Sequence, residues 1–334
     1  PENLKNNRPR INMLLAGDPG TAKSQLVGIA HKYTPNSLYG SGESMSRAGL
    51  TFSLEKDEFS GQWGVRAGLL CRANKSLVII DEADKLRGED RNGLHTPMEM
   101  GKVIVDKAGI HAEINADCSI LACCNPKHGF FDLSGSTTLP SQISLPEAIM
   151  TRFDLIFLVQ DNVDTEKDTQ VVESLFEKSE QQEEIPIELF KKYIIHASKI
   201  NPVETEEVKK ALKDTYLNLR EQTKRNSSQK GKRISARQAG GLLRLAGASA
   251  KIRLSDKIEL VDLKIAEELM LSALRTVGFV ENLGSIDQAM IYGGTTQKKL
   301  NQTNKVISSI KEAISLGKNS TDEITKYALE QQVD

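Results

Sequence analysis

The sequence lacks long apolar runs and an excess of charge of either sign. Its 334 residues hold no apolar run near the roughly 20 residues that cross a bilayer, and its start lacks the layout of a signal peptide. The 44 basic and 45 acidic residues leave a formal net charge of −1. A polyanionic partner would therefore meet a local basic feature rather than bulk charge. We expect a soluble, intracellular protein without a membrane partner.

Cysteine is also scarce, and its spacing matches no metal site. Three of the four cysteines crowd one apolar segment; the four are Cys71, Cys118, Cys123 and Cys124. We expect buried free thiols in a reducing compartment rather than disulfides or metal ligands. Hydrophobic residues make up 39% and charged residues 27% of the chain, which is typical of a globular protein. Because the chain begins abruptly at Pro1, we expect a fragment.

Residues 1–160 alternate short apolar segments with helical patterns. Such alternation predicts an α/β core with a parallel sheet and helices on both faces. Near-continuous apolar runs are typical of strands buried on both sides. We expect five such strands, at residues 11–16, 37–39, 77–80, 119–123 and 154–159.

The rest of the chain has a different character. Residues 161–185 are polar and acidic and predict a linker, whereas residues 186–280 read as wholly helical and include a basic loop at 224–233. Residues 281–334 predict a small helical module whose end is missing.

A glycine-containing loop follows the first expected strand and precedes a helix. Loops of this kind direct backbone N–H groups and the positive end of a helix dipole at phosphate oxygens. Lys23 would reach the β- and γ-phosphates of a nucleotide, and the Ser24 hydroxyl would bind Mg²⁺. Ala22 stands where a second glycine is usual. The loop and its flank consist of Gly17, Asp18, Pro19, Gly20, Thr21, Ala22, Lys23, Ser24 and Gln25.

Polar side chains follow two later strands. Asp81 and Glu82 come after residues 77–80, where Asp81 can hold hydrated Mg²⁺ and Glu82 can polarise the attacking water. Asn125 ends the next buried strand and can bind that water or the γ-phosphate. Taken alone, an Asp-Glu pair is often a strand cap and Asn-Pro a turn. Together with the phosphate loop they predict a site for a nucleoside triphosphate and Mg²⁺.

Residues 102–114 alternate in polarity about a turn at 106–109 and predict a β-hairpin with Lys107 near its tip. By themselves these residues favour an exposed hairpin whose lysine discourages pairing between edges.

These motifs resemble the AAA+ ATPases and, within them, the minichromosome maintenance (MCM) replicative helicases. The resemblance runs from about residue 10 to residue 278, at residues 17–24, 81–85, 89–91, 107–110, 125–126, 145–146 and 151–157. It implies an AAA+ P-loop core, a helical lid and a partial winged-helix tail. It also implies a hexameric ring that hydrolyses ATP between subunits and translocates on DNA.

The resemblance also assigns roles to particular residues. Arg152 aligns with the arginine finger supplied to a neighbouring subunit, Arg237 with the sensor 2 arginine and Arg91 with a further interface arginine. Lys107 would contact DNA phosphate inside the ring. Residues 49–68 resemble a second hairpin insert, in which we expect Trp63, the only tryptophan, to be a packing residue.

Two other interpretations stay open. A protein-remodelling ATPase of the MoxR/RavA type has a similar phosphate loop and inserts, and a ring can contain a non-hydrolysing scaffold subunit. The favoured interpretation implies as partners single-stranded or forked duplex DNA, identical or paralogous subunits, and replication loading factors. It implies a cytoplasmic or nucleoid location in a prokaryote and a nuclear one in a eukaryote.

Overall fold

The computed structural model describes residues 9–56, 58, 61–107, 109–131, 139–159, 161, 169, 185–225 and 236–276. All of them belong to one compact unit, Pro1–Phe279. The predicted tail at 281–334 lies outside the described residues, as do most of the predicted linker and of the basic loop. Within the described residues, no helix is both long and apolar enough to span a membrane.

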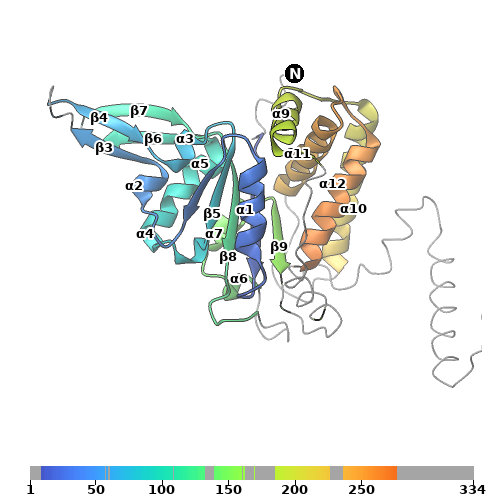
Figure 1. Cartoon of the computed structure of the whole chain (residues 1–334). Helices are drawn as coiled ribbons and strands as arrows, with labels where there is room; N and C mark the ends of the chain where they lie inside the picture. Colours follow the sequence, from blue (N-terminus) through green and yellow to red (C-terminus); the bar gives the residue numbers. More distant parts are fainter. Residues whose placement is uncertain are drawn as a thin grey trace, which may run out of the picture. The chain divides into compact units, whose positions relative to one another are not determined.

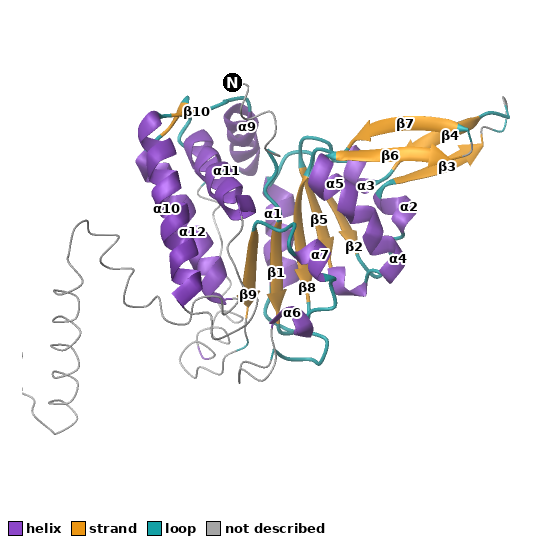
Figure 2. Ribbon diagram, turned by 180° about the vertical axis from the view of Figure 1, so that it is seen from behind, coloured by secondary structure: helices purple, strands orange, loops and turns teal. Residues whose placement is uncertain are grey.

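A five-stranded parallel sheet forms the centre of the core, in the order β2-β5-β8-β1-β9 (Figures 1 and 2). The strands are β1 (Met13–Gly17), β2 (Leu38–Ser41), β5 (Leu77–Asp81), β8 (Ser119–Cys124) and β9 (Leu155–Val159). All five predicted strands are confirmed within two residues at either end. Because the strands are parallel, their carboxyl ends meet at one edge of the sheet, where open α/β sheets bind ligands.

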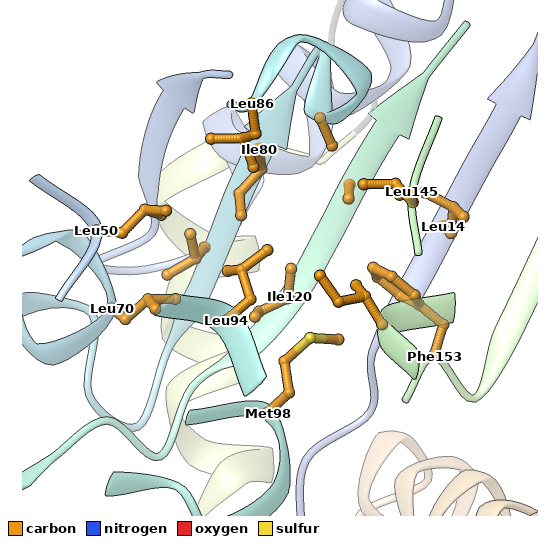
Figure 3. Close-up of a cluster of buried hydrophobic side chains, with 14 of the residues drawn as sticks. Leu14, Leu50, Leu70, Ile80, Leu86, Leu94, Met98, Ile120, Leu145 and Phe153 are labelled. Carbon is orange, nitrogen blue, oxygen red and sulfur yellow. The ribbon is translucent and has the colours of Figure 1, made fainter. Parts of the chain in front are cut away.

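Both faces of the central strands β1, β5 and β8 are largely buried, as the apolar runs predict, whereas the edge strand β2 is more exposed. Successive residues of a strand point to opposite faces, so Ile79 packs with Val27 of α1 (Lys23–Tyr33). Ile80 points the other way, into the larger cluster with Leu14 and Phe153 (Figure 3). All four cysteines are buried, as the sequence analysis expects.

Short helices cover the side of the sheet opposite α1 and connect its strands (Figure 2). The helical turns of the core are α2 (Arg47–Leu50), α3 (Leu69–Arg72), η2 (Ala83–Lys85), α4 (Gly88–Arg91), η3 (Asn92–Leu94), α5 (His95–Met100), α6 (Leu139–Gln142) and α7 (Glu147–Met150).

Two antiparallel hairpins leave the core side by side (Figures 1 and 2). One is β3 (Phe52–Lys56) with β4 (Trp63–Ala67), and the other is β6 (Lys102–Lys107) with β7 (Ile110–Asn115). Both hairpins are confirmed. The expectation for Trp63 is wrong, because this side chain is 51% exposed. It pairs with Lys56 at the outer end of its hairpin.

The described part of the lid contains four long helices, α9 (Ile187–Ser198), α10 (Glu206–Arg225), α11 (Ala236–Ile252) and α12 (Leu260–Thr276). The prediction that this region is wholly helical is wrong, because β10 (Val203–Glu204) pairs with β11 (Lys257–Ile258). Strands of two residues are too short to produce a recognisable period in the sequence.

A buried ion pair joins the lid to the core. The Arg244 guanidinium on α11 lies 2.5 Å from Asp154 Oδ1, just before β9, and the two side chains are 7% and 1% exposed. Asp154 Oδ2 also accepts a hydrogen bond from the backbone N–H of Asn12 at 2.9 Å. One carboxylate thus connects α11 with the starts of β1 and β9.

Candidate nucleotide-binding site

The loop between β1 and α1 has a backbone that only particular residues permit. A Cβ at Gly17 would lie 2.5 Å from the Val159 carbonyl oxygen, so β9 leaves room only for glycine there. Gly20 has a φ of +82°, in the left-handed region that glycine tolerates. Ala22 has a φ of 57° and is the N-cap of α1. The usual second glycine is thus replaced by an alanine that still adopts the left-handed conformation, at some cost in strain.

Lys23 closes the loop with its own ammonium group. Its Nζ donates hydrogen bonds to the carbonyl oxygens of Gly17 at 2.9 Å and Asp18 at 2.5 Å. Burial lowers the pKa of Lys23, an effect that the nearby Asp18 and Asp81 carboxylates oppose. A buried ammonium group at this position is suited to donate hydrogen bonds to a phosphate oxygen.

The Asp18 side chain ties this loop to two other segments. Its Oδ1 accepts a hydrogen bond from the backbone N–H of Phe131 at 2.9 Å, and its Oδ2 accepts one from that of Asp161 at 3.0 Å. The side chain is buried. The sequence analysis places Asp18 among the phosphate-binding residues. In the structure its carboxylate instead holds the loop against the segments of Phe131 and Asp161.

The loop faces a cavity of about 360 Å³, a size within the usual range for small-molecule sites. The cavity brings together seven of the nine predicted residues of the phosphate loop and its flank, both predicted carboxylates and the predicted amide, whereas Gly17 and Asp18 do not line it. Its lining consists of Pro19, Gly20, Thr21, Ala22, Lys23, Ser24, Gln25, Asp81, Glu82, Cys123, Cys124 and Asn125.

Asp81 and Glu82 are adjacent in the chain but are held differently. Asp81 is the last residue of β5, is 8% exposed, and accepts the Tyr39 hydroxyl on Oδ2 at 2.6 Å and the Glu82 N–H on Oδ1 at 2.9 Å. Glu82 has a φ of 51°, so the chain turns sharply after the strand. Glu82 Oε2 accepts a weaker hydrogen bond from Ser41 at 3.4 Å.

Asn125 lies directly after β8 and is positioned by a carboxylate that sequence reasoning missed. Its backbone N–H donates to Asp84 Oδ1 at 3.0 Å. Beside it, burial raises the pKa of the Cys123 thiol to about 12 and also raises that of Cys124. Both cysteines therefore remain neutral thiols that contribute shape rather than charge to the cavity.

The donor set fits a nucleotide with Mg²⁺. Mg²⁺ prefers oxygen ligands, keeps several waters and is usually held by a few protein oxygens together with phosphates. The Ser24 hydroxyl at the start of α1 and the Asp81 carboxylate at the end of β5 are such oxygens, and both line the cavity. The backbone N–H groups at the start of α1 favour a bound anion.

The arginines selected from the sequence lie elsewhere. Arg152 Nη2 lies 2.6 Å from Glu99 Oε2, and Arg237 Nη2 lies 3.6 Å from Glu99 Oε1. Arg237 Nη1 also donates to the Thr151 carbonyl at 2.7 Å. One glutamate on α5 therefore bridges an arginine of the core and an arginine of the lid. Neither arginine lines the cavity.

Arg91 is also outside the cavity, and its guanidinium is used within the chain. It donates to the carbonyl oxygens of Leu86 at 2.6 Å, Ser144 at 2.5 Å and Asp84 at 2.8 Å. These contacts fasten the segment after β5 to the segment before α7. The interface role of Arg91 stays a prediction.

Lys107 is the last residue of β6, pairs with Ile110 and is exposed. Within the described residues it has no ion-pair partner, whereas Lys102 pairs with Glu113 at 2.7 Å on the same hairpin. A cation near the end of a projecting hairpin is available to an external anion.

A parallel α/β sheet, a phosphate loop after β1 and two carboxylates after β5 define a P-loop nucleotide-binding protein of the AAA+ type. Comparison with protein families makes this more specific. The model of the MCM P-loop domain matches residues 1–179, and that of the MCM AAA-lid domain matches residues 188–274. The chain belongs to the MCM family.

Curated relatives agree with this result. DNA replication licensing factor MCM4 of Arabidopsis thaliana is 35% identical over 315 residues, which cover 92% of this chain and 37% of the relative. Minichromosome maintenance protein MCM of Saccharolobus solfataricus is 32% identical over 93% of this chain and 46% of the relative. DNA replication licensing factor mcm7 of Xenopus tropicalis is 34% identical over 78% and 37%, respectively. The chain thus spans less than half the length of these relatives, and the comparisons give no support to the MoxR/RavA alternative.

Proposed function

We propose that this chain is the motor domain of a hexameric, ATP-dependent DNA helicase that translocates on DNA and unwinds it during replication. The observation that carries the proposal is the division of the site. The cavity contains Lys23, Asp81, Glu82 and Asn125, whereas Arg152 lies outside it on Glu99. A cavity that lacks the predicted transition-state arginine suits a ring in which a neighbouring subunit supplies that arginine.

The predicted catalytic residues have the following proposed roles. Backbone N–H groups and Lys23 bind the phosphates, while Ser24 and Asp81 hold Mg²⁺, which would offset charge on the phosphates. Glu82 orients and polarises the attacking water, and Asn125 hydrogen-bonds that water or the γ-phosphate. Arg152 and Arg237 of the adjoining subunit would stabilise the charge that spreads over the transferring phosphoryl group.

The hairpins supply the proposed contact with DNA. Lys107 is exposed near the end of β6. Repeated around a ring, one such lysine per subunit would give a channel a local positive charge that the net charge of −1 does not reveal. The relatives' names concern DNA replication, which favours this partner.

The test is ATP-dependent unwinding of a forked duplex by fractions in which ring assembly has been verified by mass. Lys107→Ala should abolish unwinding at a matched rate of ATP hydrolysis, because the motor still turns over but loses its contact with DNA. Lys213→Ala removes the same charge from an exposed position on α10 and should unwind normally.

Two results would count against the proposal. Unwinding by Lys107→Ala at the wild-type rate would remove the proposed DNA contact. A verified ring that neither unwinds DNA nor changes its ATPase rate when DNA is added would reject the helicase assignment.

A further inference from the structure

The edge strand β2 contacts the carboxylates of Asp81, at the end of β5, and of Glu82, which follows it, through two hydroxyl groups. The parallel register places Tyr39 opposite Ile79 and Ser41 opposite Asp81. From its position two residues lower, the long Tyr39 side chain reaches up the strand, and its hydroxyl donates to Asp81 Oδ2 at 2.6 Å. The Ser41 hydroxyl makes the longer contact of 3.4 Å with Glu82.

The hydrogen bond from Tyr39 holds Oδ2 of Asp81 and so restricts rotation of the Asp81 carboxylate. Asp81 Oδ1 is held by the backbone N–H of Glu82 at 2.9 Å, so Tyr39 adds the second donor. Donors on both oxygens set the rotation of the carboxylate while leaving each oxygen a further lone pair. A carboxylate so oriented presents the cavity with a fixed geometry, which Mg²⁺ demands more strictly than larger cations do.

We propose that Tyr39 is a positioning residue for the nucleotide-bound Mg²⁺, acting through the Asp81 carboxylate. The inference rests on the proposed ATP and Mg²⁺ site and adds to it a side chain that no motif selects. Partners that orient a metal-binding carboxylate commonly change metal affinity by about 10–100-fold when they are removed. The lower end applies here, because Asp81 retains the Glu82 N–H.

A purely structural role for Tyr39 makes a different prediction. The ring lies 6.0 Å from that of His31 on α1, and the residue is 41% exposed. Phenylalanine would keep this ring contact and remove only the hydroxyl. If the ring contact were the whole role of Tyr39, Tyr39→Phe would bind nucleotide and metal as the wild type does.

The experiment measures binding of a methylanthraniloyl-labelled, non-hydrolysable ATP analogue to the full chain, in EDTA and across a Mg²⁺ titration. We expect Tyr39→Phe to raise the Mg²⁺ concentration at half-effect about tenfold, with affinity in EDTA unchanged. Tyr216→Phe is the matched control, because it removes a tyrosine hydroxyl from α10, where its partner is Arg220. This control should titrate as the wild type does.

A second variant separates positioning from general damage. Asp81→Asn should weaken the response to Mg²⁺ by itself, and adding Tyr39→Phe to it should change the Mg²⁺ midpoint no further. Additive effects in this cycle, an unshifted midpoint in Tyr39→Phe, or an equal loss of affinity with and without Mg²⁺ would each overturn the inference. Wild-type chain that binds no nucleotide would instead reject the proposed function itself.

Discussion

The cavity and the pair of arginines on Glu99 are built in contrasting ways. The cavity gathers residues that follow β1, β5 and β8, and internal hydrogen bonds hold Lys23, Asp81 and Asn125. Arg152 and Arg237 come from the end of α7 and the start of α11 and meet on one half-exposed carboxylate. The first arrangement contains the predicted phosphate loop, carboxylates and amide, whereas the second places two arginines on one glutamate outside the cavity.

This difference suggests that the two regions are halves of one catalytic site supplied by different subunits. A heterologous, head-to-tail contact repeated around a ring brings one surface of each subunit against a different surface of the next. Glu99 would then keep the two arginines together until a neighbour's nucleotide competes for them. Because α5 carries Glu99 and leads directly into β6, the same segment links the arginines to the hairpin of Lys107.

Removing Arg152 should have the largest effect on ATP hydrolysis. In assembled rings, Arg152→Ala should lower the ATP hydrolysis rate by about 10⁴-fold, within the range found for arginine fingers. Nucleotide affinity of the unassembled subunit should not change, because Arg152 does not line its cavity. Steady-state phosphate release and equilibrium binding of labelled ATP measure the two quantities. A large loss of affinity in the unassembled subunit would place Arg152 in its own cavity.

Removing the proposed base should have the next largest effect. Glu82→Gln keeps the size of the side chain and a polar oxygen but removes the negative charge that polarises water. We expect the hydrolysis rate to fall about 10³-fold while ATP still binds. Turnover at the wild-type rate would show that Glu82 is not the base and that the cavity is organised differently.

The link between lid and core provides a third test. Arg244→Met should lower the free energy of unfolding by about 3 kcal/mol, because Asp154 would be left buried without its cation. Urea denaturation followed by circular dichroism measures this loss. Lys213→Met removes a charge from an exposed position on α10 and should be within about 0.5 kcal/mol of the wild type. Equal stabilities of Arg244→Met and the wild type would contradict the account of this ion pair.

The smallest expected effect concerns His95, whose side chain lies near Arg152. Burial, and then the nearby Arg152 charge, lower the pKa of His95 below 6.5. Between that lowered pKa and 6.5 the unfolded chain binds more protons than the folded chain, so stability falls as the pH is lowered through this window. Denaturation midpoints of the wild type and His95→Gln, compared at pH 7.5 and 5.5, should converge if histidine is the cause. Parallel pH dependences of the two proteins would exclude His95 as the source.

Local sequence predicted one region much better than the other. Strands buried on both faces leave apolar runs such as residues 77–80, and the parallel arrangement then places Asp81, Glu82 and Asn125 near the phosphate loop. The hydrogen bond between Tyr39 and Asp81 spans 42 positions, and the contact between Arg152 and Glu99 spans 53. Nothing in the local pattern indicates such pairs, because they depend on the register of strands and the packing of loops.

Trp63 and the β10–β11 pair of the lid are two features that local sequence patterns did not predict correctly. A lone tryptophan in an alternating segment is normally expected to pack, but β4 belongs to a hairpin that projects from the core. The pairing of β10 with β11 depends on two loops of the lid that meet in space. In both cases the tertiary position of a short segment, rather than its composition, decides the outcome.

The most direct test of the divided site mixes two inactive proteins. Rings of Glu82→Gln alone or Arg152→Ala alone should be inactive, because every interface lacks one component. In random equal mixtures, roughly a quarter of the interfaces should combine an intact cavity from one subunit with an intact Arg152 from its neighbour. We predict that ATP hydrolysis reappears on mixing in proportion to those interfaces. Mixed rings, verified by mass, that remain inactive would contradict the division of the catalytic site between subunits.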